Sequence, residues 1–308
     1  MNCLVLGGNG FIGSHLVDKL LAEGHSVSVY DKYEERYRKP LRQVEYRSGD
    51  FGNRGLLSDV LAGVDTVFHL ISTSLPKTSN DDPSYDVQSN VIETLFMLEK
   101  CVELKVKKVV FISSGGTVYG RPLHLPIDEL GPTDPECSYG ITKLTIEKYL
   151  ALFHRLHGLD YAIVRPSNPY GSRQNPNGIQ GAIPVFLGKV AQGESIEIWG
   201  DGTVIRDYIY IEDLVAGICQ VASYSGAEKI FNMGSGKGYS LNELVSFMEE
   251  IIGSELRVVY QEGRNFDVPE IVLDISRANR ELGWVPRMGI EAGIRETWEF
   301  VRGVYVRT

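Results

Sequence analysis

Short apolar runs alternate with helical patterns along the first half of the chain. Between the runs, apolar residues recur at helical spacing, as at Ile12, Leu16 and Leu20, and Gly24 is typical of the end of such a helix. Strands that alternate with helices pair in parallel, and their crossovers are right-handed. The pattern therefore predicts an α/β fold with a doubly wound parallel sheet. The predicted strands are residues 3–6, 25–30, 44–47, 66–70, 108–113 and 161–165.

A second, smaller region follows residue 165, where the alternation stops. The segment 166–181 is rich in proline and glycine and predicts a loop before the next helix. Further on, a helical pattern at 212–222 and an apolar run at 229–233 are long enough to return to the first sheet. We therefore expect a discontinuous division. The first domain comprises residues 1–167 and 207–234, and a smaller α/β domain comprises residues 168–206 and 235–308.

Composition and charge narrow the class of protein. The chain has 308 residues, of which 43% are hydrophobic, so it can bury one large core or two smaller ones. With 31 basic and 40 acidic side chains the net charge is −9, which disfavours a nucleic-acid-binding protein. No apolar run reaches the roughly 18 to 20 residues needed to cross a membrane, and the first run is too short for a signal peptide. We expect a cytoplasmic protein without a membrane partner.

The cysteines do not predict a metal site. They are far apart, and no two of them have the C-x-x-C spacing of a zinc site. We expect reduced and mostly buried thiols rather than disulfides at Cys3, Cys101, Cys137 and Cys219.

The first predicted strand leads directly into a glycine-rich turn. Gly7, Gly10 and Gly13 have the spacing G-x-x-G-x-x-G and stand where a helix begins. Gly7 permits the tight turn, Gly10 lets backbone amides approach a pyrophosphate, and Gly13 lets the helix pack against the strand. The helix N-terminus adds N–H groups and a partial positive charge. Glycine fills tight turns in many proteins, but this position predicts a Rossmann domain that binds a dinucleotide.

Asp31 indicates which dinucleotide is bound. It ends the second predicted strand, where a carboxylate can accept hydrogen bonds from ribose hydroxyls and would repel a 2′-phosphate. NAD is therefore favoured over NADP, although Lys32 could compensate a phosphate. Asp50 could meet the adenine amino group or be a solvated loop residue, and Asn90 could bond backbone or mark a helix boundary. The other expected cofactor contacts are Phe11, Ile12, Phe51 beside the adenine ring, Leu70, Ile71, Ser72, Ser113 and Pro166.

Tyr139 and Lys143 are four residues apart in a helical pattern, so their side chains project from one face. A lysine cation, together with the positive nicotinamide ring of NAD, would lower the pKa of a phenol from its usual value of about 10. A phenolate closer to neutral pH is a usable base. The alternative is an exposed pair at chance spacing, which is common in helices.

Small hydroxyl residues follow the fifth predicted strand. Thr117 could hydrogen-bond a reacting alcohol, whereas Ser113 and Ser114 could instead bond their own backbone. This segment lies at the carboxyl edge of the sheet, where ligands of open α/β folds bind.

Taken together, these motifs resemble the extended short-chain dehydrogenase/reductases, and within them the NAD-dependent nucleotide-sugar epimerases that interconvert UDP-glucose and UDP-galactose. The resemblance covers nearly the whole chain. It rests on Gly7-x-x-Gly10-x-x-Gly13, Tyr139-x-x-x-Lys143 and the segments 113–120, 165–171, 206–209 and 232–234, which occur in the family's order.

The resemblance implies a role for each part of the site. Tyr139 is expected to be the catalytic base and acid, Lys143 to hold the nicotinamide ribose and lower the phenol pKa, and Thr117 to help bind the reacting 4-hydroxyl. The implied reaction is transient oxidation to a 4-keto sugar and re-reduction on the opposite face. The resemblance also implies a homodimer formed through predicted helices 86–103 and 138–156.

Gly115 departs from the family pattern, because these epimerases usually carry a catalytic serine there. Thr117 or Ser114 must then substitute, or the proton must pass directly through Tyr139. Related dehydratases and decarboxylases have a carboxylate in this stretch, whereas residues 115–117 are Gly-Gly-Thr. An epimerase is therefore favoured over a dehydratase or a reductase of the same fold, and a non-catalytic NAD-binding protein is a further alternative.

An acidic chain must meet a nucleoside diphosphate with a few placed arginines, whose planar forks engage phosphate oxygens in pairs. By the same resemblance, Arg206 binds the diphosphate with Asn168 as its amide partner, and Trp199 stacks on the uracil ring. Arg264 and Asp267 resemble a late Arg-x-x-Asp motif with the same ligand.

Ile271 corresponds to a position that faces the sugar in the family. A tyrosine there crowds the pocket, whereas isoleucine is smaller. We therefore expect UDP-N-acetylglucosamine to be accepted as well as UDP-glucose.

Overall fold

The computed structural model describes residues 1–263 and 268–306. Seven strands form its central sheet: β1 (Asn2–Leu6), β2 (Ser26–Asp31), β3 (Val44–Ser48), β4 (Thr66–His69), β5 (Lys108–Ile112), β6 (Asp160–Pro166) and β10 (Ile230–Met233). They pair in the order β10-β6-β5-β4-β1-β2-β3, and every pair is parallel. The predicted strands and the predicted return of 229–233 to the sheet are confirmed.

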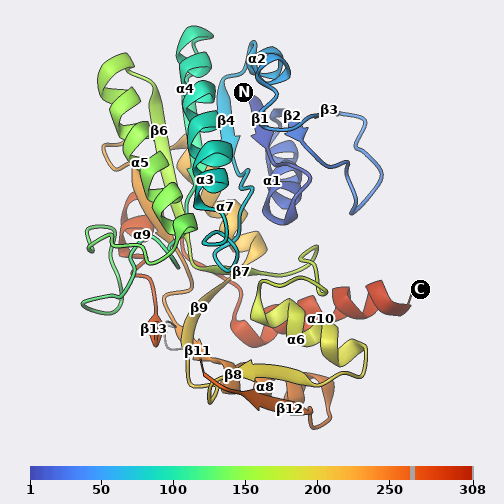
Figure 1. Ribbon diagram of the computed structural model, residues 1–308. Coiled ribbons are helices and arrows are strands. Elements are labelled where there is room, and N and C mark those ends of the chain that lie inside the picture. Colours follow the sequence, from blue (N-terminus) through green and yellow to red (C-terminus); the bar gives the residue numbers. More distant parts are fainter. Residues whose placement is uncertain (264–267, 307–308) are drawn as a thin grey trace.

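Helices cover both faces of this sheet (Figure 1). Helix α1 (Phe11–Ala22) and helix α7 (Ile211–Ser223) pack on one face, and their apolar residues form a continuous core with the strands. Helices α2 (Arg54–Leu61), α4 (Glu93–Glu103) and α5 (Ser138–His157) cover the other face around Leu57, Met97 and Ile146. Because both faces are covered, the central strands read as apolar runs. The strand order reverses between β1 and β4, which is where ligands of doubly wound folds bind.

The predicted helix over 86–103 is not one continuous α-helix. It divides into α3 (Pro83–Asp86), a π-helical turn η1 (Val87–Ile92) and α4. In the π-helical turn, the Asn90 side chain donates to the Asp86 carbonyl at 3.1 Å, and the Thr94 hydroxyl donates to the Asn90 carbonyl at 2.6 Å. Side chains that bond the backbone in this way compete with regular helix hydrogen bonds. Such turns are frequent at functional sites.

The smaller region lies at the lower end of the molecule in Figure 1, on the side toward which the carboxyl ends of the large sheet point. Strands β11 (Gly238–Ser240), β9 (Ile205–Tyr210) and β13 (Glu270–Ile271) form one sheet, and β7 (Asn168–Tyr170) also pairs with β9. Strand β8 (Ile196–Trp199) pairs with β12 (Val258–Gln261). The remaining helices are α6 (Ala182–Ala191), α8 (Leu241–Ile252), α9 (Ser276–Leu282) and α10 (Ile290–Val306).

Strand β9 runs through the boundary expected at residue 207. The whole strand belongs to the smaller sheet, and α7, which packs on the large sheet, begins directly after it at Ile211. By sheet pairing, residues 207–210 therefore go with the smaller sheet, and the chain returns to the large sheet at residue 211.

Candidate active site

The glycine turn after β1 is built for close approach. A Cβ at Gly13 would lie 2.1 Å from the Gly7 carbonyl oxygen, and a Cβ at Gly8 would lie 2.7 Å from the Val29 side chain. Gly7 itself has φ of +86°, which favours glycine. Gly10 is the N-cap of α1, so the N–H groups of the first turn point toward the space beyond the strand. This cradle fits the pyrophosphate of a dinucleotide.

Asp31 joins the end of β2 to this turn. Its carboxylate is 7% exposed and accepts the N–H groups of Asn9 at 3.0 Å and Tyr33 at 2.9 Å. Burial raises the pKa of Asp31, and these hydrogen bonds oppose that effect. A carboxylate has about four lone-pair sites, so Asp31 can still accept from ribose hydroxyls. Lys32 pairs with Asp50 at 3.3 Å, so a carboxylate already balances its charge. The arrangement favours NAD over NADP.

The loop after β4 lies against the glycine turn. A Cβ at Gly7 would be 3.2 Å from the Ile71 nitrogen and 3.4 Å from the Leu70 carbonyl carbon. The Asn90 carbonyl oxygen Oδ1 accepts the Thr73 N–H at 3.0 Å, so Asn90 holds this loop through its backbone. Of the two interpretations of Asn90, the structure supports the one in which it bonds backbone.

Two of the expected cofactor residues make contacts within the protein. The Phe51 ring is buried in the core, with its centroid 5.1 Å from that of His69. The Ser72 hydroxyl donates to the Ser74 carbonyl at 3.2 Å and so supports its own loop.

Tyr139 and Lys143 occupy the first turns of α5 beside the end of β5. The Lys143 ammonium lies 5.5 Å from the Tyr139 ring centroid and 4.8 Å from that of Phe111. It donates to the Ile112 carbonyl at 2.9 Å. Lys143 is 5% exposed and Tyr139 is half-buried, so this is not an exposed pair at chance spacing. The structure brings the two side chains together at the carboxyl edge of the sheet.

The pKa values of this pair differ from the expectation of a lowered phenol pKa. Burial raises the pKa of Tyr139, and the charges of Cys137 and Asp86 raise it further. Burial also lowers the pKa of Lys143 to about 8, with Asp86 and Glu147 opposing the change. The surrounding protein therefore keeps the phenol protonated, because loss of water disfavours its charged form.

A buried ion pair lies one turn behind Lys143. The Arg165 guanidinium, 2% exposed, donates to both carboxylate oxygens of Glu147, at 3.0 Å through Nε. The Ser113 hydroxyl donates to the same carboxylate, so Ser113 belongs to this network. The Tyr119 ring covers the guanidinium, 4.8 Å from its centroid. Helix α5 is thereby tied to strands β5 and β6.

Thr117 carries the hydroxyl best suited to meet a reacting alcohol. Its Oγ1 is buried, and within the described residues it has no hydrogen-bond partner. An unpartnered buried hydroxyl costs free energy that a bound ligand can recover. The Ser114 carbonyl accepts the Val118 N–H at 3.2 Å, so Ser114 contributes to the turn that carries Thr117.

Gly115 has no room for the serine found in related proteins. A Cβ there would lie 2.6 Å from Leu273 Cδ1 and 3.0 Å from the Pro166 carbonyl oxygen. That carbonyl accepts the Gly115 N–H at 2.8 Å. Leu273 is fully buried and fills the space in which a serine side chain would stand.

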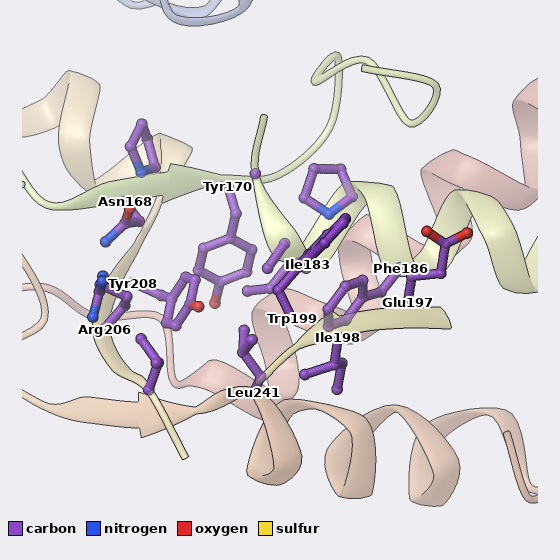
Figure 2. A pocket seen from close by; sticks show the side chains of 15 residues that line it. Asn168, Tyr170, Ile183, Phe186, Glu197, Ile198, Trp199, Arg206, Tyr208 and Leu241 are labelled. Carbon is purple, nitrogen blue, oxygen red and sulfur yellow. The ribbon is translucent and has the colours of Figure 1, made fainter. Parts of the chain in front are cut away.

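A cavity of about 300 Å³ opens in the smaller region (Figure 2). Asn168 and Arg206 lie together at one end of it, and Trp199 lies toward the other. The Asn168 amide donates to the Asp207 carbonyl at 2.8 Å, and Trp199 is 46% exposed. The other lining residues are Pro169, Tyr170, Gly181, Ala182, Ile183, Pro184, Phe186, Glu197, Ile198, Val204, Tyr208 and Leu241. A cation and an aromatic face in one cavity suit a nucleotide.

Asp207 fixes this cavity relative to the rest of the site. Its buried carboxylate accepts the N–H groups of Ser235 at 2.7 Å, Gly236 at 3.3 Å and Leu273 at 3.3 Å. Burial raises the pKa of Asp207, and these hydrogen bonds oppose it. The neighbouring Arg206, on β9, lies directly opposite Ile271 on β13. Arg264 and Asp267, the remaining predicted contacts, lie outside the described residues.

Sequence reasoning missed several residues of the site. Gly8 has less room than Gly7 or Gly10, and Tyr170 and Tyr208 line the cavity. Tyr208 lies inside the matched segment 206–209, so that motif could have indicated it. The hydrogen bonds of Asp86 to Ser74 and Ser138 gave no signal, because these residues are far apart in the chain.

Neither a metal centre nor a membrane-spanning helix is found in residues 1–263 and 268–306. No three His, Cys, Asp or Glu side chains there gather as metal ligands would. No helix of that part is long and apolar enough to cross a bilayer. The four cysteines are free, and Cys137 is half-buried whereas the others are buried.

The fold and the site define a NAD-binding protein of the Rossmann class with a cavity in its smaller region. The chain belongs to the NAD dependent epimerase/dehydratase family, which matches residues 3–234. It is thus an extended short-chain dehydrogenase/reductase, as the motifs indicate.

Similar proteins cover the whole chain. A putative UDP-glucose 4-epimerase of Methanocaldococcus jannaschii is 36% identical over 97% of this chain and 98% of its own length. The structure of UDP-glucose 4-epimerase from Thermotoga maritima with UDP-glucose is 36% identical, with a TM-score of 0.94 over 99% of this chain and 100% of that one. The Thermus thermophilus enzyme in complex with NAD is 31% identical, with a TM-score of 0.91 over 98% and 99%.

We predict that Gly13→Ala releases NAD. The added Cβ would overlap the Gly7 carbonyl and push helix α1 away from the turn, so bound NAD should fall at least about tenfold. NAD extracted from purified protein and quantified by chromatography measures this. Gly55→Ala is the control, because a Cβ there meets only Asn53 Oδ1 at 3.7 Å. Equal NAD content in both variants would contradict the proposed cradle.

Proposed function

We propose that this chain is a NAD-dependent UDP-sugar 4-epimerase that interconverts UDP-glucose and UDP-galactose. The Tyr139–Lys143 pair carries the proposal, together with the Thr117 hydroxyl, which has no partner among the described residues. Thr117 packs against Gly140, the residue after Tyr139. The family and the relatives named UDP-glucose 4-epimerase support it. So does the lack of a carboxylate at residues 115–117, where a dehydratase would need one.

In the proposed reaction Tyr139 exchanges one proton with the sugar. The Thr117 hydroxyl orients the 4-hydroxyl, and the phenolate form of Tyr139 takes the proton from that oxygen. Bound NAD would take up the hydride that leaves C4 and give it back to the opposite face, and its positive ring charge would favour the phenolate. Tyr139 then returns its proton to the 4-keto oxygen. No net oxidation results, so the same cofactor serves every cycle.

Lys143 and Gly115 define how that proton travels. The Lys143 ammonium beside the phenol stabilises the phenolate, and its remaining N–H groups can reach ribose hydroxyls. Residue 115 is glycine, and Leu273 fills the space beside it. No serine at this position therefore stands between Tyr139 and the substrate. Of the routes left open by the sequence, the direct one through Tyr139, assisted by Thr117, fits best.

The cavity in the smaller region suits the nucleotide end of the substrate. The chain is acidic, so a diphosphate requires a cation placed at its site. Arg206 supplies such a cation, with a planar guanidinium that suits phosphate oxygens. Asn168 stands beside it, and Trp199 offers an aromatic face to a base. We therefore assign residues 1–167 and 211–234 to NAD binding, and residues 168–210 and 235–308 to the nucleotide sugar.

Tyr139→Phe should abolish epimerisation while NAD stays bound. Loss of the phenolic proton carrier should lower kcat for UDP-galactose by about 10²- to 10⁴-fold. Conversion without added cofactor, followed by NMR, measures this. Tyr149→Phe on the same helix is the matched control, and near-normal turnover by Tyr139→Phe would contradict the role.

UDP-N-acetylglucosamine should be turned over at a rate similar to UDP-glucose. Ile271 is buried in an apolar cluster with Val118, Ile127 and Leu273, and it is smaller than the tyrosine that crowds related pockets. The values of kcat/KM for the two sugars, compared with one enzyme preparation, test this. Absence of any N-acetylated turnover would remove the proposal.

A nucleotide-sugar reductase is the second candidate. A dTDP-4-dehydro-6-deoxyglucose reductase of Escherichia coli is 32% identical over 97% of this chain and 97% of its own length. A reductase would consume NADH or NADPH in proportion to product, whereas an epimerase consumes neither. The same NMR assay, with cofactor absorbance recorded, separates the two.

We further propose a cytoplasmic homodimer formed through the α4 and α5 face. The four cysteines are free, which suits a reducing compartment. On α5, Ile141 is 51% exposed and Leu156 is 65% exposed, so this face carries large apolar side chains that a second copy can cover.

Light scattering after size exclusion should therefore give twice the chain mass of 34.3 kDa. Leu156→Glu should shift the population toward the monomer, because it places a charge in the interface. Ile179→Glu, at an exposed residue outside α5, should leave the dimer unchanged. A monomeric wild-type protein would exclude the proposal.

A further inference from the structure

Helix α5, which carries Tyr139, is capped by a distant segment. Its own N-cap, Cys137, makes no side-chain capping hydrogen bond. Instead the Ser138 N–H donates to Asn80 Oδ1 at 2.9 Å, and the Tyr139 N–H donates to the Ser79 hydroxyl oxygen at 3.0 Å. The loop between β4 and α3 thus supplies acceptors for two N–H groups at the start of the helix.

The Asp86 side chain holds the same junction through hydrogen bonds to three side chains. Its carboxylate has no exposed surface and accepts the Ser138 hydroxyl at 2.7 Å through Oδ2. Through Oδ1 it accepts the Ser74 hydroxyl at 2.5 Å and the Asn90 amide at 2.8 Å. One side chain therefore ties together the loop after β4, the π-helical turn and the residue before Tyr139.

The hydrogen-bond donors of the buried Asp86 side chain are all neutral groups. Among the described residues, no lysine, arginine or histidine forms a salt bridge with it. A buried carboxylate without a cation is costly, and neutral donors only partly offset that cost. The partial positive charge at the N-terminus of α5 stabilises an acidic group at this end. An acidic side chain buried at such a cost points to a role beyond packing.

We propose that Asp86 is a positioning residue for the reaction of Tyr139: it fixes the Ser138–Tyr139 backbone and places a carboxylate near the phenol and ammonium pair. This inference rests on the proposed function. A negative charge on Asp86 favours the protonated form of Lys143 and raises the proton affinity of the phenolate. Tyr139 is thereby a stronger base toward the sugar 4-hydroxyl, and it holds that proton until it returns it to the keto oxygen.

The charges around the pair agree with this role. Asp86 raises the pKa of both Tyr139 and Lys143, so its removal should lower both. The other titratable groups that face the pair are Cys137 at the start of α5 and Glu147 one turn beyond Lys143. Arg165 neutralises Glu147. His69 on β4 faces Lys143, and burial lowers the pKa of His69 to about 3, so it is neutral.

The test is the pH profile of kcat for Asp86→Asn. Asparagine keeps the size of the side chain and can still bond Ser138, but it removes the charge. Because both pKa values should fall, both limbs of the profile should move to lower pH, by about half a unit to one unit. Asp82→Asn is the matched control, because Asp82 is the exposed N-cap of α3 and asparagine caps equally well. Its profile should match wild type.

Ser138→Ala separates the tether from the charge. It removes one hydrogen bond to Asp86 and leaves the carboxylate, so kcat should fall several-fold with an unchanged pH profile and an unchanged KM. An unshifted profile in Asp86→Asn, with wild-type kcat in both variants, would overturn the inference.

Hydrogen exchange provides a readout that does not depend on epimerase activity. Asn80 is exposed, so Asn80→Ala should fold, and the amides at the start of α5 should exchange faster than in wild type because they have lost an acceptor. Unchanged exchange would overturn the capping role. If wild-type protein converted no UDP-sugar while exchange still responded, the proposed function would fail and the tether would stand.

Discussion

The ion pair between Arg165 and Glu147 is the interaction on which the candidate site depends. It joins the helix that carries Tyr139 and Lys143 to strand β6, and the Ser113 hydroxyl brings in β5 through the same carboxylate. Both side chains are 2% exposed. Loss of either partner would leave a buried charge without compensation, which costs about 3 to 5 kcal/mol. The three elements therefore hold a fixed geometry, as proton transfer at one oxygen demands.

Two further buried carboxylates also hold separate segments together, by accepting backbone N–H groups. Asp31 holds the glycine turn against β2, and Asp207 gathers three N–H groups around the smaller sheet. In each case an acidic side chain accepts N–H groups from a loop that has no regular partner. The site is thus assembled from irregular segments pinned by side chains to a regular sheet.

The sequence was sufficient for the sheet and for the kind of cofactor, because the features that indicate them are local. A buried parallel strand is an apolar run, and Gly13 or the Tyr139–Lys143 spacing is legible within one turn. What it could not provide depends on contacts between distant residues. Leu273 closes the space beside Gly115 from 158 positions away, and Asp86 bonds Ser74 and Ser138, which are 12 and 52 positions from it. The raised pKa of Tyr139 escaped for the same reason, since spacing reveals a neighbouring lysine but not burial.

The nucleotide cavity and the Tyr139 side of the site are linked by very little chain. Pro166 contacts Gly115, and Asn168 lines the cavity, only two residues further along an extended segment of roughly 7 Å. In the proposed reaction the bound nucleotide would tether the keto sugar at one end. The sugar could then rotate within the site without escaping into bulk solvent. Its local concentration would then be set by the length of the diphosphate and not by diffusion.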